Sequence, residues 1–129
     1  MSYYFSKVVD KPFEEAIKHT TEVLKEKGFG VLTEIDVQAT LKKKLGIDKR
    51  PYRILGACNP PLAHRALEAD PDIGLLLPCN VVVREEEDGS NTVAFMDPAA
   101  VLGLVDRPDI AELGMEVRDK LYRVRDALQ

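Results

Sequence analysis

Short apolar runs alternate along this chain with longer segments whose apolar residues recur every three or four positions. Runs of four to eight apolar, aromatic or β-branched residues are typical of strands, whereas a spacing of three to four is typical of helices that bury one face. The pattern predicts strands over residues 3–9, 29–35, 51–58, 73–84 and 92–96. Helices are predicted between the earlier strands and after the last one.

Polar caps and glycine or proline stops mark the ends of these helices. A helix often begins at Asp or Asn, with Pro in its first turn, and ends near Gly. These signals predict helices between Asp10 and Gly28, Asp36 and Gly46, and Asn59 and Asp70, a short turn from Asp97 to Leu104, and a last helix from Asp106 to Leu128. The last helix carries a single apolar seam, formed by Ile110, Leu113, Val117, Leu121, Val124 and Leu128.

The segment over residues 73–84 is the longest apolar run of the chain. Its continuous apolar composition favours a strand that is buried on both faces. Pro78 has no N–H to donate, so this strand is bulged or unpaired there, or consists of two segments. The pair Asp88 and Gly89 indicates a hairpin turn, so we expect the strand over 73–84 and the strand over 92–96 to be antiparallel neighbours.

The order of the predicted elements favours an α+β fold. Strands and helices alternate at first, and two strands then follow each other directly, which favours one mainly antiparallel sheet covered by helices on one face. A chain of 129 residues hides roughly two-thirds of its unfolded surface on folding, and 45% of its residues are hydrophobic. We therefore expect a single domain over residues 1–129 that needs no disulfide or structural metal.

Charge and composition narrow the possible partners. The formal net charge is −4 and the isoelectric point is near 5.2, so there is no basic footprint for nucleic acid. No apolar run approaches the roughly 18 to 20 residues of a membrane-spanning helix, and the first residues lack the layout of a signal peptide. We expect a cytoplasmic protein without a nucleic-acid or membrane partner. The charged content of 31% is compatible with a thermophilic source.

The strongest local feature is a dipeptide that occurs twice, Cys58-Asn59 and Cys79-Asn80. If the two strands are neighbours, both thiols and both amides converge on one spot and form a candidate ligand-binding pocket. Cys58 stands just before a predicted helix, whose free N–H groups and dipole would lower the pKa of its thiol. A thiolate beside amide donors could bind a soft metal, exchange with a disulfide or attack an electrophile.

A structural role for the same residues is the competing interpretation. Free cysteine packs as a small apolar group, and Cys58 stands where a side chain often packs on Ala63. Asn59 is already explained as a helix cap. Only Asn80 lacks a local explanation, so the pocket hypothesis makes it a buried polar anchor that needs hydrogen-bond partners. The sequence leaves both interpretations open.

Other chemistry is weakly supported or absent. A metal site of Cys58, Cys79, His64 and Asp97 is disfavoured because the cysteines are 21 positions apart, so we expect no metal and no cofactor. His64 is predicted on the solvated side of its helix, and His19 likewise at the surface. The sequence contains no phosphate-binding glycine loop and no Gly-x-Ser-x-Gly, which excludes serine hydrolysis. Whether the protein is an enzyme stays undecided.

Four segments together resemble a known family. They are Gly-Phe-Gly-Val-Leu-Thr-Glu-Ile-Asp at residues 28–36, Ile-Leu-Gly-Ala-Cys-Asn-Pro at 54–60, Leu-Pro-Cys-Asn-Val at 77–81 and Phe-Met-Asp-Pro at 95–98. The chain resembles the domain of unknown function 302 family over nearly its whole length. The resemblance implies an α+β fold with a curved sheet, related to the TATA-binding-protein architecture, and a homodimer. It implies no activity, and the acidic composition argues against DNA binding.

Two functional hypotheses follow. The first is a small ligand-binding or thiol-reactive module whose pocket lies around Cys58, Asn59, Cys79 and Asn80. The alternative is a non-catalytic homodimeric assembly module in which both cysteines are structural. In that case the seam of the last helix or a sheet edge would form the contact, although the same seam would serve equally to cover the sheet.

Overall fold

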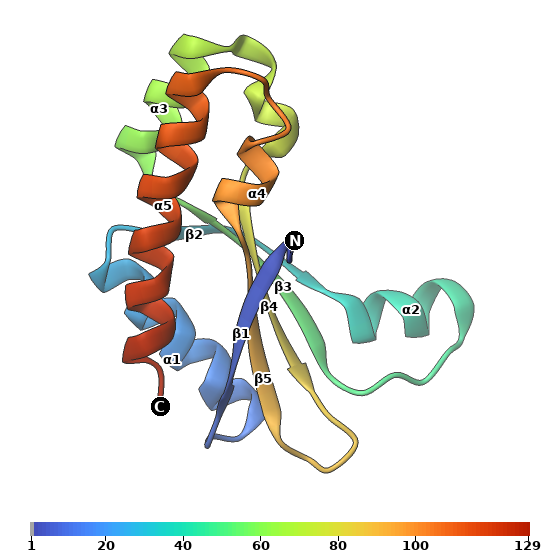
Figure 1. Cartoon of the computed structure of the whole chain (residues 1–129). Helices are drawn as coiled ribbons and strands as arrows, with labels where there is room; N and C mark the ends of the chain where they lie inside the picture. The colour runs from blue at the N-terminus through green and yellow to red at the C-terminus, as the bar shows by residue number, and fades with distance from the viewer. Residues whose placement is uncertain (1) are drawn as a thin grey trace.

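Five strands form one antiparallel sheet in the computed structural model, which describes residues 2–129 (Figure 1). Their spatial order is β1-β5-β4-β3-β2, and every neighbouring pair is antiparallel. The strands are β1 (Tyr4–Val9), β2 (Gly30–Asp36), β3 (Tyr52–Cys58), β4 (Cys79–Glu85) and β5 (Asn91–Met96). The prediction of an α+β fold with one antiparallel sheet is confirmed.

Helices cover one face of this sheet. The helices are α1 (Phe13–Glu26), α2 (Val37–Leu45), α3 (Pro60–Ala69), α4 (Pro98–Leu102) and α5 (Pro108–Ala127), with a 3₁₀ helix η1 (Pro71–Leu76). Helices α1, α3 and α5 lie on one side of the sheet, whereas α2 projects away on the other side (Figure 1). None of the helices within residues 2–129 has the length and apolar composition needed to cross a bilayer.

Three of the predicted helix caps are present. The side chains of Asp36, Asn59 and Asp97 each accept a hydrogen bond from a backbone N–H in the first turn of α2, α3 and α4, respectively. These bonds satisfy N–H groups that have no partner inside the helix. The sequence therefore placed these three helix starts correctly.

The two other predicted caps are wrong. Helix α1 begins after Pro12 and α5 after Arg107, and neither start has a side-chain cap. Asp10 lies two positions too early and Asp106 one position too early, because the residue that caps a helix must directly precede its first turn. An acidic residue in the first turn, such as Asp109 in α5, favours the helix start through the dipole instead.

The long apolar run is not one strand. Its first part forms η1, whose start is capped by the Asp70 side chain, and β4 begins only at Cys79. Pro78 precedes that first strand residue, so the missing N–H falls outside β4. Burial alternates along β4, with the outward-facing residues exposed or half-buried, so the prediction of burial on both faces is wrong. The run is apolar because Ile73 of η1 is itself buried in the core.

The turn between β4 and β5 follows the sequence prediction. Gly89 has a φ of 86°, a conformation that favours glycine, and its N–H donates to the carbonyl of Glu86. Strand β4 pairs with β5 in antiparallel register. The expected hairpin is confirmed.

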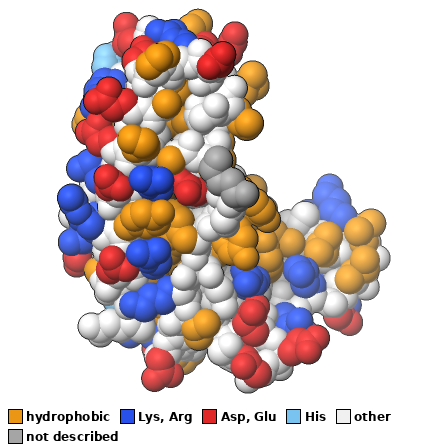
Figure 2. Space-filling view, in the orientation of Figure 1, with side chains coloured by type: hydrophobic (Ala, Val, Ile, Leu, Met, Phe, Trp, Pro, Cys, Tyr) orange, Lys and Arg blue, Asp and Glu red, His pale blue; other side chains and the backbone are white. Residues whose placement is uncertain are grey.

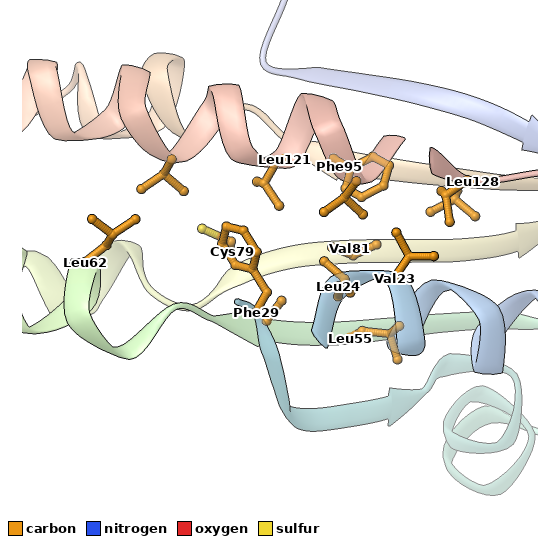
Figure 3. Packing of buried hydrophobic residues seen from close by; sticks show 14 of the residues in the cluster. Val23, Leu24, Phe29, Leu55, Leu62, Cys79, Val81, Phe95, Leu121 and Leu128 are labelled. Carbon is orange, nitrogen blue, oxygen red and sulfur yellow. The ribbon is translucent and has the colours of Figure 1, made fainter. Parts of the chain in front are cut away.

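The core lies between the sheet and the helices. Figure 3 shows Leu121 of α5, and Leu128 just after it, in one layer of buried side chains with Phe95, Val81 and Val23. Every residue of the predicted α5 seam is buried: Ile110, Leu113, Val117, Leu121, Val124 and Leu128. The seam therefore covers the sheet, and it offers no surface to a partner.

The opposite side of the sheet carries a second set of side chains. We call this surface the open face. Its residues follow from strand register and alternation. They include Tyr4, Ser6, Val8, Ile35, Tyr52, Ile54, Asn80, Val82, Arg84, Thr92 and Ala94.

Candidate ligand-binding cavity

A cavity of about 360 Å³ lies where the ends of the strands meet the helices. Cys58 and Cys79 line it from neighbouring strands, and Asn59 lines it from the start of α3. The other lining residues come from β2, β3, β5, α3, η1, α4, α5 and the segments that connect them, and no charged side chain is among them. They include Phe29, Leu32, Thr33, Leu62, Ala63, Ala66, Leu67, Leu77, Met96, Leu102 and Val117.

Small side chains create the space. Ala57 lines the cavity from β3, and Ala63 and Ala66 line it from α3. Protein interiors are otherwise close-packed, so alanines that face each other across two elements leave a hollow that larger neighbours surround. Leu62, on the same helix, fills part of the gap and is buried.

The two thiols come together through strand pairing. In the antiparallel register Ala57 lies opposite Cys79. Cys58 directly follows Ala57 and is therefore close to Cys79. Figure 3 shows the sulfur of Cys79 directed toward the part of the core that holds Leu62. The expectation that β3 and β4 are neighbours and bring both thiols to one place is confirmed. Both thiols are free.

Burial controls the acidity of these thiols. It raises the pKa of the Cys58 thiol, and it raises the pKa of the Cys79 thiol to about 12, with a smaller contribution from Cys58. The prediction that the start of α3 lowers the pKa of Cys58 is wrong. Burial removes the thiolate from water, which raises the pKa, and the Leu62 N–H at that helix start donates to Asn59 Oδ1 at 3.2 Å.

The Asn59 amide is fixed by a hydrogen bond and lies close to the backbone at Gly28. Its Oδ1 is fixed by the cap of α3. Its Nδ2 lies close to Gly28, where an added Cβ would come within 3.1 Å of that nitrogen. Gly28 also has a φ of 90°, so glycine is favoured there for both reasons. This amide and the Thr33 hydroxyl are polar groups in an otherwise apolar cavity.

Asn80 does not belong to the cavity. It is exposed on the open face, beside a separate surface hollow lined also by Tyr4, Tyr52 and Arg84. The prediction of a buried polar anchor is therefore wrong. Successive strand residues point to opposite faces, so the inward position of Cys79 forces Asn80 outward.

The histidines and Asp97 stand apart from the cavity. His64 is exposed on α3, as predicted. His19 is half-buried at the surface, where its Nε2 accepts a hydrogen bond from the backbone N–H of Gln129 at 3.3 Å. Asp97 caps α4. Within residues 2–129, no three acidic, histidine or cysteine side chains gather as a metal site would require.

Most of the cavity wall escaped the sequence reasoning. Met96, Leu102 and Val117 were assigned only to strands, turns or the helix seam, yet they line the cavity. The residue type of each shows only that its side chain is apolar, and it does not show which side chains share a cavity. The alanines at inward positions of α3 were the available signal, because they predict less filling than the leucines around them.

The comparisons with known proteins agree with this architecture. The family model described as Domain of unknown function DUF302 matches residues 5–128. The chain belongs to the DUF302 family. The crystal structure of an uncharacterized conserved DUF302 protein from Bacillus stearothermophilus is 30% identical, with all of both chains covered and a TM-score of 0.93. No curated protein matches the chain. The resemblance drawn from the four sequence segments is confirmed.

Proposed function

We propose that this DUF302 protein binds a small, uncharged, apolar molecule in the cavity beside Cys58, Asn59 and Cys79. The observation that carries the proposal is a cavity of about 360 Å³ without a charged side chain in its wall. Ligand pockets typically have volumes of roughly 300 to 1,000 Å³, apolar walls and a few polar groups. The amide of Asn59 and the hydroxyl of Thr33 are such groups.

The wall decides the class of ligand. An ion in this cavity would lose its hydration without gaining a countercharge, which is costly. The wall is almost entirely apolar, and the polar residues that contribute to it, Asn59 and Thr33, are uncharged. The ligand that fits is therefore uncharged and mainly apolar, such as a medium-chain alcohol or ketone.

The thiols favour binding over nucleophilic chemistry. The thiolate is the reactive form of cysteine, and burial raises the pKa of both Cys58 and Cys79. Near neutral pH both side chains therefore contribute polarisable, uncharged surface to the cavity. Free thiols also support our proposal of a cytoplasmic location, where thiols stay reduced.

A fluorescence titration with N-phenyl-1-naphthylamine, an uncharged apolar probe, tests the proposal. We expect saturable binding of one probe per chain. We expect 1-octanol to displace the probe at a concentration at least about tenfold lower than octanoate does, because octanoate carries a charge that the wall cannot neutralise.

A filled cavity provides the matched comparison. Ala63→Phe places a ring in the cavity and should abolish probe binding, whereas Ala111→Phe, on the exposed side of α5, should leave it unchanged. If Ala63→Phe does not fold by circular dichroism, Leu67→Trp at the partly exposed rim replaces it. Absence of saturable binding in the wild type, or equal displacement by octanoate, would refute the proposal.

Assembly as a homodimer is a second candidate function, which the family resemblance implied. The seam of α5 is buried in the core and cannot provide the contact. A different observation favours assembly: the open face and α2 expose large apolar side chains, including Tyr4, Val8, Ile35 and Leu45. Exposed apolar patches of this kind mark association surfaces.

A further inference from the structure

We infer that two copies of this chain associate through the open face, with the basic end of α2 of each copy placed against the acidic β4–β5 turn of the other. This inference deepens the second candidate function, homodimer assembly, by naming its contact surface. It is independent of the ligand cavity, which lies on the helix-covered side of the sheet.

Helix α2 is an amphipathic helix without a burial site in its own chain. None of its residues is buried, although Leu41 and Leu45 continue the apolar stripe that begins at Val37. Leu45 is 65% exposed and Ile47, just after the helix, is 49% exposed. A helix of nine residues is only marginally stable by itself. Burial of its apolar stripe against another surface would stabilise the helix.

The open face provides apolar and aromatic surface next to α2. Ile35, the last but one residue of β2, is 50% exposed and leads directly into the helix. Tyr4 and Val8 extend the exposed surface to the far edge strand. Figure 2 shows hydrophobic side chains in the hollow beside α2. Tyr52 of β3 and Arg84 of β4 lie between the two edge strands, β1 and β2. Tyrosine and arginine are enriched at protein interfaces.

Charge complementarity identifies a second copy as the partner. Residues 42–44 at the end of α2 are all lysine, and the β4–β5 turn carries four consecutive acidic residues at 85–88. Within residues 2–129, Lys43 and Lys44 form no ion pair, and Glu87 has only a distant one with Arg50 at 4.0 Å. A two-fold axis brings each basic segment toward the partner's acidic turn, which is the self-complementarity that a symmetric dimer requires.

Sedimentation velocity on the full chain at 1 to 100 µM, in reducing buffer, is the experiment. We expect a dimer of twice the 14.4 kDa chain mass. Ile35→Glu should convert it to a folded monomer. Met115→Glu should leave the dimer intact, because Met115 is similarly exposed, at 49%, but lies on α5 across the molecule.

A charge-reversal pair tests the arrangement itself. Lys44→Glu and Glu87→Lys should each weaken the dimer about fivefold, since both symmetric contacts change, and the combined variant should restore it. Restoration by the combined variant requires a contact between these two segments in two copies. This test does not depend on whether Ile35→Glu folds.

The opposite results are equally clear. A wild-type chain that stays monomeric over the whole range overturns the inference and leaves the open face to a different protein. A dimer that survives Ile35→Glu, or a combined charge reversal that dissociates further, overturns the proposed surface. Probe titration of the folded Ile35→Glu monomer separates the two proposals, because the cavity should bind the probe unchanged whatever the state of assembly.

Discussion

The chemistry of Cys58 and Cys79 is set by where their side chains lie. Cys79 is buried and its thiol has a pKa of about 12, whereas Cys58 is half-buried and its pKa is raised by burial alone. A free cysteine has a pKa of about 8.5. The folded protein therefore holds both thiols in the protonated form through the physiological range.

Alkylation by iodoacetamide should show this protection. For Cys79 we expect the rate to rise about tenfold per pH unit from pH 7 to 10 without a plateau, because the thiolate fraction grows that way below the pKa. In urea the same thiol should level off above pH about 8.5. Peptide mass spectrometry measures each cysteine separately. A plateau for Cys79 below pH 9 in the folded protein would contradict the raised pKa.

The side chain of Arg53 joins four elements of the fold through ion pairs. Arg53 of β3 bonds Glu14 of α1 and Glu34 of β2, both at 2.9 Å, and lies 3.5 Å from Asp36 at the start of α2. Burial alone would lower the pKa of Arg53, but its hydrogen bonds to Glu34 and Glu14 raise it. The guanidinium therefore stays charged and ties the start of α2 to the body of the protein.

Helices α4 and α5 meet at Gly114. A Cβ at this position would lie 2.8 Å from the carbonyl oxygen of Pro98 and 3.2 Å from the Cα of Ala99. Both atoms belong to the backbone of α4, so they cannot rotate away as the end of a side chain can. Glycine at this position allows α4 to pack closely, and Leu102 of α4 in turn forms part of the cavity wall.

Gly114→Ala should therefore destabilise the protein by about 1 to 3 kcal/mol, the usual cost of overpacking. Helix propensity alone predicts that Gly114→Ala makes the protein more stable, since alanine stabilises a helix interior by roughly 1 kcal/mol relative to glycine. Urea unfolding followed by circular dichroism measures the change. Ala111→Gly, on the exposed side of the same helix, is the control and should cost only the propensity difference. A Gly114→Ala variant more stable than wild type would contradict the close contact.

The whole molecule has two faces with different properties. The cavity opens on the helix-covered side, and the other side leaves the open face and α2 exposed (Figures 1 and 2). Binding of a small ligand and association of two copies therefore use separate surfaces. A change on one surface can be tested with the other as an internal control.

Thermal stability should depend on protein concentration if the open face is a dimer contact. Association stabilises the folded state by mass action, so the Tm of the wild type should rise by about 3 °C for each tenfold increase in concentration. The Tm of Ile35→Glu should not change with concentration, and that of Met115→Glu should follow the wild type. Differential scanning calorimetry provides the measurement. A constant Tm for the wild type would mean that no dimer forms before unfolding.

Local signals in the sequence were sufficient for most of the elements. Asp36, Asn59 and Asp97 mark helix starts because a cap depends only on residues within one turn. The seam of α5 was predicted because its spacing matches the period of the helix. The pairing of β4 with β5 followed from the short turn at Gly89. These features depend on neighbours in the chain, so the chain alone was enough to predict them.

Tertiary structure decided the rest. The apolar run before Cys79 forms η1 because Ile73 packs in the core, a contact that no local pattern records. Asn80 faces away from the cavity because strand register assigns each residue to a face of the sheet. Desolvation by distant elements raises the pKa of Cys58, although its position in the sequence beside a helix start suggested the reverse. The sequence by itself determined the fold class, most element boundaries and the two neighbouring thiols. Which side chains share a cavity, and how burial changes their acidity, depended on the packing of segments far apart in the chain.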